Sequence, residues 1–594
     1  MIITSLVEHY ELLVENTPDI PKRGWATIKV SLALDISAEG QLIDITPLKI
    51  EVESGKKDKE GKAKRIELPT ELVVPEPFKR ASNIRPHFLC DTSTYLLGID
   101  KEGKPTKEDR FNASAKYHTE ILGQAPDCKV AQAICKFFDN WQVEQALEND
   151  IIKNYLAEPA NVAELSKANI VFFVEGERAL DKDTIKQLWE NEISKGSENP
   201  IEICLIKGTS NHISRLHPCV KGVQGAQSSG ASLVSYNSES FESYGATKAQ
   251  SYNSHISEYV TFAYTTMLSY LLAKQEHKII LGGDTIVFWA KEVDNAYADM
   301  MSTMFNPIGE NQIKKLTTIL QFIDQGKLPE NTDFNTPFYI LALAPNSARL
   351  SVRFFYRDTF GQLVDNISKH YKRIEIIKPE KAKDYLTFRD IILETVNPNA
   401  SDKDKGTGAL TAELFKAVLN NTPYPPMLYS QVILRLRATQ DNRDKKQVKV
   451  SYKKVAIIKA YLCKKDSRYK EILDVKLNEE TNYTPYVLGR IFSILENIQE
   501  SAIGTSTIKD QYFNSACVTP SLVFPLIQKL SIHHVKVLKR DKPGLAVNLQ
   551  KELGQLIDRI DETLPKQMSL EDQGIFIIGY YHETQKRFTK KADK

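Results

Sequence analysis

The stretch NPNASDKDKGTG, at Asn397–Gly408, marks the change in composition that decides how this chain of 594 residues is organised. It concentrates Pro, Gly, Asp and Lys, a composition typical of a linker. Before it, strand and helix patterns alternate irregularly; after it, the patterns are almost wholly helical. The sequence therefore predicts an α+β protein, with an irregular mixed α/β region over 1–396, a linker over 397–408 and an all-α helical bundle over 409–594.

The mixed region contains several short segments with the period of a strand. Thr27–Ile36 alternates between apolar and polar residues, Ser37–Gly40 suits a turn, and the alternation resumes as far as Val52, which predicts a β-hairpin. Ser54–Arg65, SGKKDKEGKAKR, then predicts an exposed mobile loop, because it is dense in charge and holds two glycines. Further strands are expected over Asn169–Val174 and Ile201–Ile206, both buried, over Asp284–Ala290, and over Pro337–Ala344 and Ala348–Tyr356 as a second hairpin around Pro345 and Asn346.

Apolar residues with helical spacing predict two helices in the mixed region, over Lys129–Leu147 and Ser257–Lys274. The part beyond the linker is expected to be a bundle of antiparallel helices, because its connections are short. The helices expected there are Thr411–Asn420, Met427–Thr439, Val448–Cys463, Pro485–Glu500, Pro520–Leu538, Leu545–Asp561 and Leu570–Phe588.

Composition bounds the class of protein. The chain is 42% hydrophobic and 26% charged with a formal net charge of +2, so it is an ordinary globular protein and no polybasic nucleic-acid binder as a whole. The start, MIITSLVEHYELLVE, lacks the features of a targeting peptide, and no apolar run reaches the roughly 18 residues that a membrane span needs. Seven scattered cysteines without a CxxC pair fit a reducing cytoplasm.

Motifs that carry chemistry are missing from the sequence. It holds no GxxxxGK[ST] loop, HExxH or GxSxG. His212, His217 and Cys219 are a weak zinc pattern, and His533 and His534 would point about 100° apart on a helix. We therefore expect a binding protein with no catalytic residues, no metal and no cofactor.

The segment Gly222–Gly245, GVQGAQSSGASLVSYNSESFESYG, is rich in side chains that donate and accept hydrogen bonds without titrating. Such a segment suits contact with a polar polymer and is a poor place for acid–base chemistry. An ordered surface loop is the alternative interpretation.

Charge is segregated within the predicted bundle. Gln431–Lys470, called here the basic segment, holds 13 Lys or Arg against three Asp, with Tyr452, Tyr461 and Tyr469 between them. Basic residues interleaved with aromatic ones suit the tracking of a single nucleic-acid strand. A solvated helix face is the alternative.

Separate motifs, taken in order, resemble one family from end to end: the large subunit of the type I-C CRISPR surveillance complex (Cascade), the Cas8c/Csd1 family. Any one motif is weak, but their order is specific. The motifs are KRASNIRP (79–86), LCD (89–91), YLLG (95–98), SYN (235–237), SFESYG (240–245), GDTIVFWA (283–290), LAPNSARLSVR (343–353), YVLGR (486–490), VFP (523–525), HH (533–534) and FIIGYYH (576–582).

The resemblance implies a non-catalytic subunit in the bacterial cytoplasm. Such a protein reads the protospacer-adjacent motif (PAM) in double-stranded DNA, helps to open the duplex and stabilises the R-loop, while guide pairing supplies specificity. The implied partners are the guide RNA, the target duplex, the handle-binding and backbone subunits, and a helicase–nuclease recruited after R-loop formation. A small subunit translated from within the same gene is also implied, and a start at Met427 would give a chain of 168 residues; Val448, Val450 and Val455 are alternative starts.

The resemblance and the residue types together nominate candidate contacts. A PAM reader needs donors and acceptors for base edges and cations for phosphates. A turn or capping role is the alternative for Asn83 and Asn237. Arg349 and Arg353 lie four residues apart and hence on one face of a regular strand, and a structural salt bridge is the alternative for them. The candidates for PAM and DNA binding are Lys79, Arg80, Ser82, Asn83, Arg85, Gln224, Gln227, Ser228, Asn237 and Ser240. Those for the nucleic-acid backbone are Lys56, Lys57, Arg349, Arg353, Arg435, Arg437, Lys449, Lys453, Lys454, Lys464 and Lys465.

Two other functions compete with this interpretation. One is a nuclease or RNA-processing subunit of the same defence system, which would need a cluster of His, Lys or carboxylate groups. The other is a scaffold that binds only RNA or protein and never contacts DNA.

Overall fold

The computed structural model describes residues 1–17, 20–57, 63–77, 84–100, 102–106, 109–165, 167–194, 199–236, 238–242, 250–327, 332–397, 408–442, 447–560 and 563–588, without the side chains of 52–57, 63–66 and 194. The chain forms two compact units. The first is built mainly from Ile3–Pro218 and Val234–Met267, and the second from Cys219–Leu233 and Leu268–Lys594.

A five-stranded sheet forms the centre of the first unit. The hairpin expected around Ser37–Gly40 is confirmed: β2 and β3 pair antiparallel across this turn, where Gly40 has a φ of +79° that favours glycine. β2 also pairs in parallel with β7, so the hairpin lies at one side of a mixed sheet. The strand order is β3-β2-β7-β6, with β8 paired to β7, and the strands are β2 (Leu32–Ile36), β3 (Leu42–Pro47), β6 (Cys90–Asp91), β7 (Ile170–Val174) and β8 (Glu177–Arg178).

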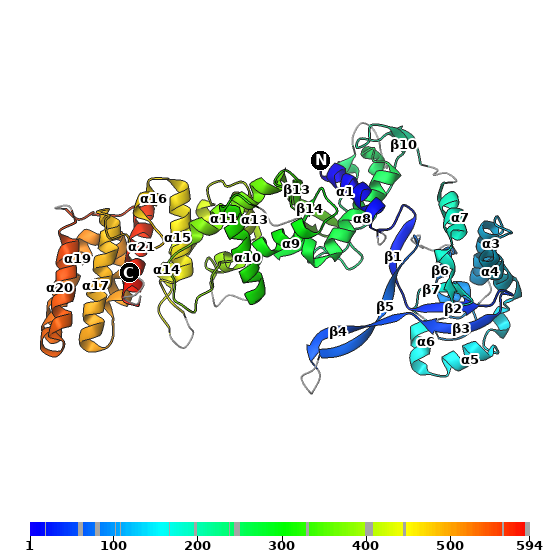
Figure 1. Cartoon of the computed structure of the whole chain (residues 1–594), viewed down its shortest axis with the longest axis horizontal. Coiled ribbons are helices and arrows are strands. Elements are labelled where there is room, and N and C mark those ends of the chain that lie inside the picture. Colours follow the sequence, from blue (N-terminus) through cyan, green and yellow to red (C-terminus); the bar gives the residue numbers. More distant parts are fainter. Residues whose placement is uncertain are drawn as a thin grey trace. The chain divides into compact units, whose positions relative to one another are not determined.

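The outer parts of the predicted hairpin belong to a second sheet. β1 (Trp25–Val30), β5 (Ala63–Pro75) and β4 (Lys49–Lys57) pair antiparallel in the order β1-β5-β4, and β4 and β5 run together as a long arm (Figure 1). The loop predicted over Ser54–Arg65 is therefore too long, because Lys57 is already paired with Ala63. The middle of that segment, 58–62, lies outside the described residues.

Helices α4 and α5 pack against the five-stranded sheet, and the helix expected over Lys129–Leu147 is confirmed as α4, with Ile134, Phe137 and Phe138 buried, although it ends at Asn140. The expected helix near Ser257 is confirmed as α8. The prediction of a buried strand over Ile201–Ile206 is wrong in its burial, since β9 (Ile201–Ile203) pairs only with β10 (Ser210–His212) and Ile201 is 61% exposed. The helices are α1 (Ile2–Asn16), α2 (Ser93–Leu96), α3 (Asp109–Leu122), α4 (Lys129–Asn140), α5 (Asp150–Leu156), α6 (Pro159–Leu165), α7 (Asp183–Ser194) and α8 (Glu258–Ala273).

The second unit contains a four-stranded antiparallel sheet in the order β11-β12-β13-β14. The second predicted hairpin is confirmed as β13 and β14, although the turn is centred on Ser347, whose φ is +53°. Apolar side chains of α9, α11 and the strands share one core. The elements are β11 (Lys278–Leu281), β12 (Asp284–Ala290), β13 (Pro337–Asn346), β14 (Arg349–Thr359), α9 (Ala296–Phe305), α10 (Gly309–Asp324), α11 (Phe360–Ile374) and α12 (Phe388–Leu393).

The rest of the second unit is helical, as expected. All seven predicted helices are present, but α15 begins at Tyr452, because the Ser451 side chain caps it by accepting a hydrogen bond from the Lys454 N–H at 3.3 Å. Helices α16 and α18 were not predicted. The helices are α13 (Gly408–Leu419), α14 (Pro426–Ala438), α15 (Tyr452–Lys465), α16 (Tyr469–Ile472), α17 (Thr484–Ile503), α18 (Ile508–Val518), α19 (Pro520–Asp541), α20 (Pro543–Ile557) and α21 (Leu570–Lys586).

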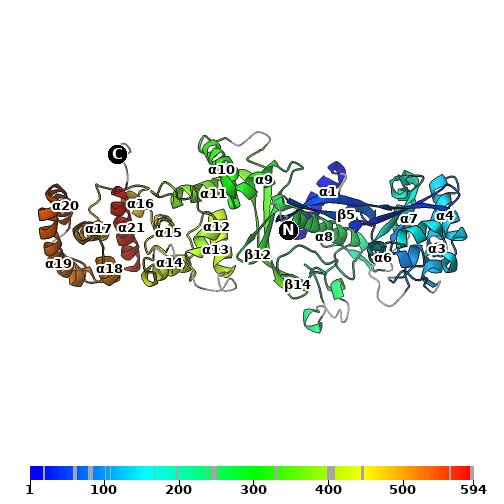
Figure 2. The same ribbon diagram turned by 90° about the horizontal axis from the view of Figure 1, so that it is seen from below.

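Two glycines explain the closest helix pair of this region. A Cβ on Gly489 of α17 would lie 2.0 Å from the Phe576 carbonyl oxygen, and a Cβ on Gly579 of α21 would lie 2.2 Å from the Tyr486 carbonyl oxygen. The two helices therefore approach at reciprocal glycines, and the motifs YVLGR and FIIGYYH have a structural basis. Figures 1 and 2 both show α17, α19 and α20 side by side.

The composition change at 397–408 does not separate the two compact units. Residues 398–407 lie outside the described residues, but α12 and α13 on either side belong to the same unit and lie side by side (Figure 2). The ring of Phe415 is 5.1 Å from that of Phe388 and 4.8 Å from that of Phe305. The helical part thus shares a continuous core with the four-stranded sheet. Within the described ranges, no helix is both long enough and apolar enough to cross a membrane.

Candidate nucleic-acid interface

A loop of the second unit, Cys219–Leu233, here called the anchored loop, is fastened to the four-stranded sheet. The backbone N–H of Gln224 donates a hydrogen bond to Thr285 Oγ1 at 2.9 Å, and the Thr285 side chain is buried at the start of β12. Gly225, at a φ of +76°, lies against Pro345, since a Cβ there would be 3.3 Å from the proline Cγ. The sequence therefore folds this polar segment onto β12 and the end of β13.

The same loop is also joined to the edge strand β14. The Ser232 N–H donates to the Ala348 carbonyl at 3.0 Å, and the Leu350 N–H donates to the Ser232 carbonyl at 3.0 Å. These two bonds make a parallel bridge between Ser232 and Arg349. Two candidate segments that are more than 100 residues apart in the sequence thus lie side by side in one unit.

The outer part of the anchored loop presents uncharged polar groups. Gln224, Gln227 and Ser228 are exposed, and the Gln227 carbonyl accepts from the Gly230 N–H at 2.9 Å, which closes a turn. Amide and hydroxyl groups of this kind can donate to and accept from base edges or phosphate oxygens. The loop therefore has a backbone that is fixed by hydrogen bonds and polar side chains that are exposed to solvent.

A β-bulge changes the prediction for the two arginines of β14. Ala342 pairs with Phe354 and Leu343 pairs with Val352, so Arg353 is the extra residue of the bulge. Arg349 and Arg353 are therefore not related as residues four apart on one face of a regular strand, because a bulge redirects the side chain that it contains.

Arg353 is held by one acid and remains largely open to solvent. Its Nε donates to Asp284 Oδ1 at 3.4 Å, the Arg353 side chain is 55% exposed and that of Asp284 is 9% exposed. Burial raises the pKa of Asp284, and the Arg353 guanidinium opposes that rise. The pair is the structural salt bridge that was one alternative for this arginine, yet the guanidinium keeps donors free for a phosphate.

Sequence reasoning missed a third arginine on the same strand. Arg357 follows Arg353 by four residues and is exposed, with its guanidinium 5.9 Å from the ring centroid of Tyr339. The spacing of four residues along β14 was a usable signal.

The remaining candidates of the polar segment do not belong to the anchored loop. Ser240 is exposed and its hydroxyl lies 3.0 Å from that of Ser238, but both belong to the first unit. Asn237 lies outside the described residues. The segment Gly222–Gly245 therefore contributes to two units and is not one continuous site.

In the KRASNIRP motif, Arg85 is described and exposed, and Lys79, Arg80, Ser82 and Asn83 lie outside the described residues. The residues that follow are firmly anchored: the buried ring of Phe88 stacks 5.4 Å from Trp189 and 5.5 Å from His118. Arg85 thus precedes a fixed point of the first unit. Lys56 and Lys57 end β4, and their side chains lie outside the description.

Three lysines of the basic segment do not lie on a solvated face. Lys449, Lys454 and Lys459 are buried, and Lys454 Nζ donates to the carbonyls of Val448 and Lys449 at 3.2 Å each. Burial lowers the pKa of all three lysines. Lys449 and Lys454 were predicted as backbone contacts; because their ammonium groups are enclosed in this fold, they are not part of an exposed interface.

Other cations of the basic segment are engaged by partners within the protein. Lys453 Nζ lies 3.2 Å from Asp390 Oδ1, Lys465 pairs with Glu571 and Arg437 donates to Gln573. Arg435 is half-buried. Much of the positive charge on the described part of the basic segment is therefore buried or paired within the fold; Lys464 and Lys470 are treated below, and Arg443, Lys445 and Lys446 lie outside the described residues.

Two histidines that raised the question of zinc have other partners. His217 Nδ1 lies 2.6 Å from the Tyr264 hydroxyl, and His212 Nδ1 lies 2.7 Å from the Asn199 carbonyl. Among the residues that the structure describes, no group of three or more His, Cys, Asp or Glu side chains is arranged to hold a metal ion.

Comparison with known proteins gives a single assignment. Residues 6–588 match the family model described as CRISPR-associated protein (Cas_Csd1). No curated protein sequence matches this chain. Because the match extends over nearly the whole length, through both compact units, the chain belongs to the Cas_Csd1 family of CRISPR-associated proteins, the large subunits of a Cascade complex.

Proposed function

We propose that this chain is a non-catalytic large subunit that recognises the PAM in double-stranded DNA, helps to open the duplex, stabilises the R-loop and serves as a platform for the helicase–nuclease. The family membership supports its place in a CRISPR surveillance complex. The observation that carries the proposal further is the joining of the anchored loop to β14, where Gln224, Gln227 and Arg353 are exposed in one unit.

The two kinds of group in this region suit the two tasks of a duplex reader. Uncharged amides and hydroxyls on a fixed loop backbone are suited to base edges or groove waters, and arginines beside them are suited to phosphates. A rigid sheet beneath the loop limits the ordering entropy that binding would cost. The Lys79–Arg85 segment belongs to the first unit and is a separate candidate for PAM contact, which rests on the resemblance alone.

Variants of the exposed groups test the proposal in the reconstituted complex. Gln227→Ala should reduce discrimination between matched and scrambled PAM duplexes, and Arg353→Gln should weaken binding to both equally, because phosphate contacts carry no sequence information. The matched control is Arg389→Gln on α12, which removes an exposed arginine of the same unit. Unchanged discrimination in Gln227→Ala, Arg80→Ala and Asn83→Ala would remove these residues from the PAM-reading surface.

We also propose that the small subunit begins at Met427. A chain begun there keeps α14 from its second residue, and with it the hydrogen bond from the Tyr429 hydroxyl to the Leu570 carbonyl at 2.8 Å. It also keeps the stacking of Tyr429 on Tyr461 at 4.4 Å. Starts at Val448 or later delete α14. Mass spectrometry of the purified complex should find a fragment with its N-terminus at Met427, and detection of only the full-length chain contradicts this.

A further inference from the structure

Two cations from different helices share one neutral acceptor in the second unit. Arg373 lies at the end of α11 and Lys464 at the end of α15. Arg373 Nη2 donates to Asn421 Oδ1 at 2.9 Å, and Lys464 Nζ donates to the same oxygen at 3.0 Å. Because both donors carry a positive charge and the acceptor carries none, the charge of this cluster is not compensated at its centre.

Arg373 is held in place by a second contact of the same loop. Its Nη1 donates to the Tyr424 hydroxyl at 2.9 Å, and its guanidinium lies 5.5 Å from the centroid of the Tyr424 ring. Tyr424 in turn meets His370 Nδ1 at 2.7 Å. Burial, and then Arg373 itself, lower the pKa of His370 to about 3, so this ring is neutral and adds no charge beside the guanidinium. The guanidinium is therefore oriented before any ligand arrives.

More positive charge surrounds Lys464. Burial first, and then Arg373, Lys470 and Lys369, lower the pKa of its ammonium group. Two acids of this region have other partners. Asp365 Oδ2 lies 2.5 Å from Lys369 Nζ, and the charge of Asp474 raises the pKa of Cys463 and of Lys459. Lys470 is exposed on α16. The cluster thus combines an oriented guanidinium, a partly buried ammonium and an exposed ammonium.

We propose that Arg373, Lys464 and Lys470 bind a phosphate group of a single nucleic-acid strand, with the Asn421 carboxamide occupying the position of a phosphate oxygen when no strand is bound. A phosphate oxygen carries a negative charge that the carboxamide oxygen lacks, so it attracts the two cations more strongly and should displace the amide. The inference deepens the proposed function and rests on it for the identity of the strand.

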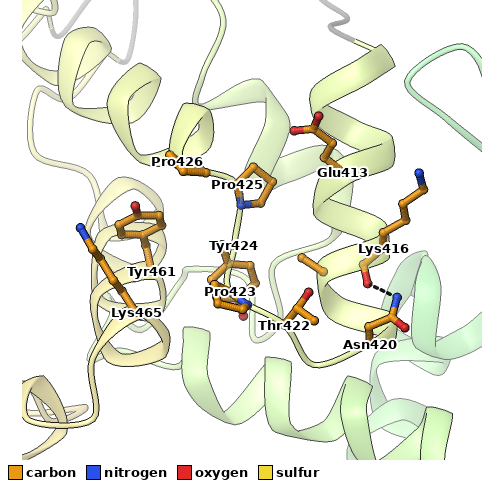
Figure 3. A pocket seen from close by; sticks show the side chains of 11 residues that line it. Glu413, Lys416, Asn420, Thr422, Pro423, Tyr424, Pro425, Pro426, Tyr461 and Lys465 are labelled. Carbon is orange, nitrogen blue, oxygen red and sulfur yellow. Dashed lines mark hydrogen bonds between the residues drawn. The ribbon is translucent and has the colours of Figure 1, made fainter.

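The neighbouring surface favours a strand over a free anion. The loop Thr422–Pro426 walls a cavity of about 440 Å³, with Glu413 and Lys416 of α13 on one side and Tyr461 and Lys465 of α15 on the other (Figure 3). Tyr424 and Tyr461 are buried, so the apolar surface that the wall offers to a base is that of the exposed Pro423 and Pro426, a surface that a free phosphate does not need. Tyr424 belongs to both the cavity wall and the cation cluster, so the two features adjoin.

The test measures binding of 5′-labelled dT20 to the full chain by fluorescence anisotropy over a range of salt. Each lysine that contacts a phosphate contributes about 0.7 to the slope of log K against log salt, which corresponds to about fivefold in affinity at 0.1 M salt. In Lys464→Gln and in Lys470→Gln, the slope should fall by about 0.7 and the affinity for dT20 at 0.1 M salt should fall about fivefold. Lys529→Gln on α19 is the matched control, because it removes an exposed lysine elsewhere in the unit. Equal losses in the control, or unchanged slopes in the two variants, overturn the proposal.

Asn421→Asp gives a readout that a structural role does not produce. Asn421 has a φ of +48°, a conformation that Asp also tolerates, and the new carboxylate would pair with both cations. We expect at least fivefold weaker dT20 binding together with an unchanged or higher melting temperature. Unchanged dT20 binding in a stable Asn421→Asp protein contradicts the proposal.

Calorimetry with inorganic phosphate separates the two possible sources of the anion. If Lys464→Gln abolishes phosphate binding but leaves the dT20 slope unchanged, the site takes a free anion and the strand proposal is overturned. PAM discrimination by the complex is measured in parallel. Normal discrimination with a reduced dT20 slope supports the site, whereas absent discrimination in the wild-type complex would reject the proposed function without affecting this site.

Discussion

The backbone N–H of Gln224 donates its hydrogen bond to the buried hydroxyl of Thr285, 61 residues away, at a distance of 2.9 Å. Asp284, next to Thr285 in the chain, is the partner of Arg353. One end of β12 therefore positions both the polar loop and an arginine of the edge strand. The GDTIVFWA motif therefore has a structural role, because it holds both the loop and the arginine in place.

Thr285→Val should disturb the anchored loop without emptying the core, since valine has almost the same shape. The Gln224 N–H loses its acceptor, which costs about 1–3 kcal/mol if the group stays buried. We expect weaker discrimination between PAM duplexes and unchanged binding to a guide-complementary single strand, measured by gel shift of the complex. The control is Thr303→Val on α9, a buried threonine whose hydroxyl donates to the Asp299 carbonyl. Equal losses on both DNA substrates would argue against a specific role for this hydrogen bond.

Lys454→Glu should destabilise the protein, because the side chain is buried and its ammonium donates to two backbone carbonyls. Replacing this donor by a carboxylate leaves an unpaired buried charge among carbonyl oxygens, at a cost of about 3–5 kcal/mol. Lys454→Met fills the same space with a neutral group and should be much better tolerated. Denaturation of both variants checks this, and a fully stable Lys454→Glu protein with impaired DNA binding would restore Lys454 to the interface.

Gly489→Ala should separate α17 from α21. The added Cβ would lie 2.0 Å from the Phe576 carbonyl oxygen, a backbone atom that cannot move alone. Overpacking of this kind typically costs about 1–3 kcal/mol and can cost more against backbone. Gly554→Ala on α20 is the matched control, because nothing lies within 4 Å of a Cβ there and alanine is the better helix former. Thermal melting should show a clear loss for the first variant and no loss for the second.

Stability should fall as the pH is lowered from 7.5 to 5.5. Burial lowers the pKa of His118 and His217 to about 4, and of His370 and His582 to about 3. The unfolded chain takes up a proton on each near its ordinary value of about 6.5, so each site loses up to about 1.4 kcal/mol of stability per pH unit below that value. The loss continues until the pH reaches the folded pKa.

The denaturant midpoint at the two pH values measures this loss. His582→Asn keeps an acceptor for the Tyr486 hydroxyl, which lies 2.8 Å from His582 Nδ1, and removes the titrating ring. Its midpoint should therefore depend less on pH than that of the wild type. A wild-type midpoint that is the same at pH 7.5 and 5.5 would contradict the account.

The sequence was sufficient for the fold class and for most elements, because period and turn residues act locally. The β13–β14 hairpin and the helices near Lys129 and Pro485 followed from these signals. The short apolar run at Ile201–Ile206 gave a wrong prediction of burial, because such a run does not show which short strand receives a covering layer. The change in composition at Asn397 coincides with a change in secondary structure but not with a boundary between compact units, because Phe415 packs on Phe305 across it.

For the candidate site, residue types were predictable and their burial was not. Lys454 and Arg353 look alike in the sequence, yet tertiary structure encloses the first and exposes the second. The bulge at Arg353 depends on pairing with β13, and the meeting of Arg373 with Lys464 depends on three separate segments. No local pattern contains either relationship.

The central claim is tested most directly by target-duplex binding of the reconstituted complex, with and without this chain, on matched and scrambled PAM. We predict that preference for the matched PAM appears only when the chain is present and that Gln227→Ala and Arg80→Ala reduce it. A preference that persists without the chain would place PAM reading in another subunit and leave this protein as a scaffold.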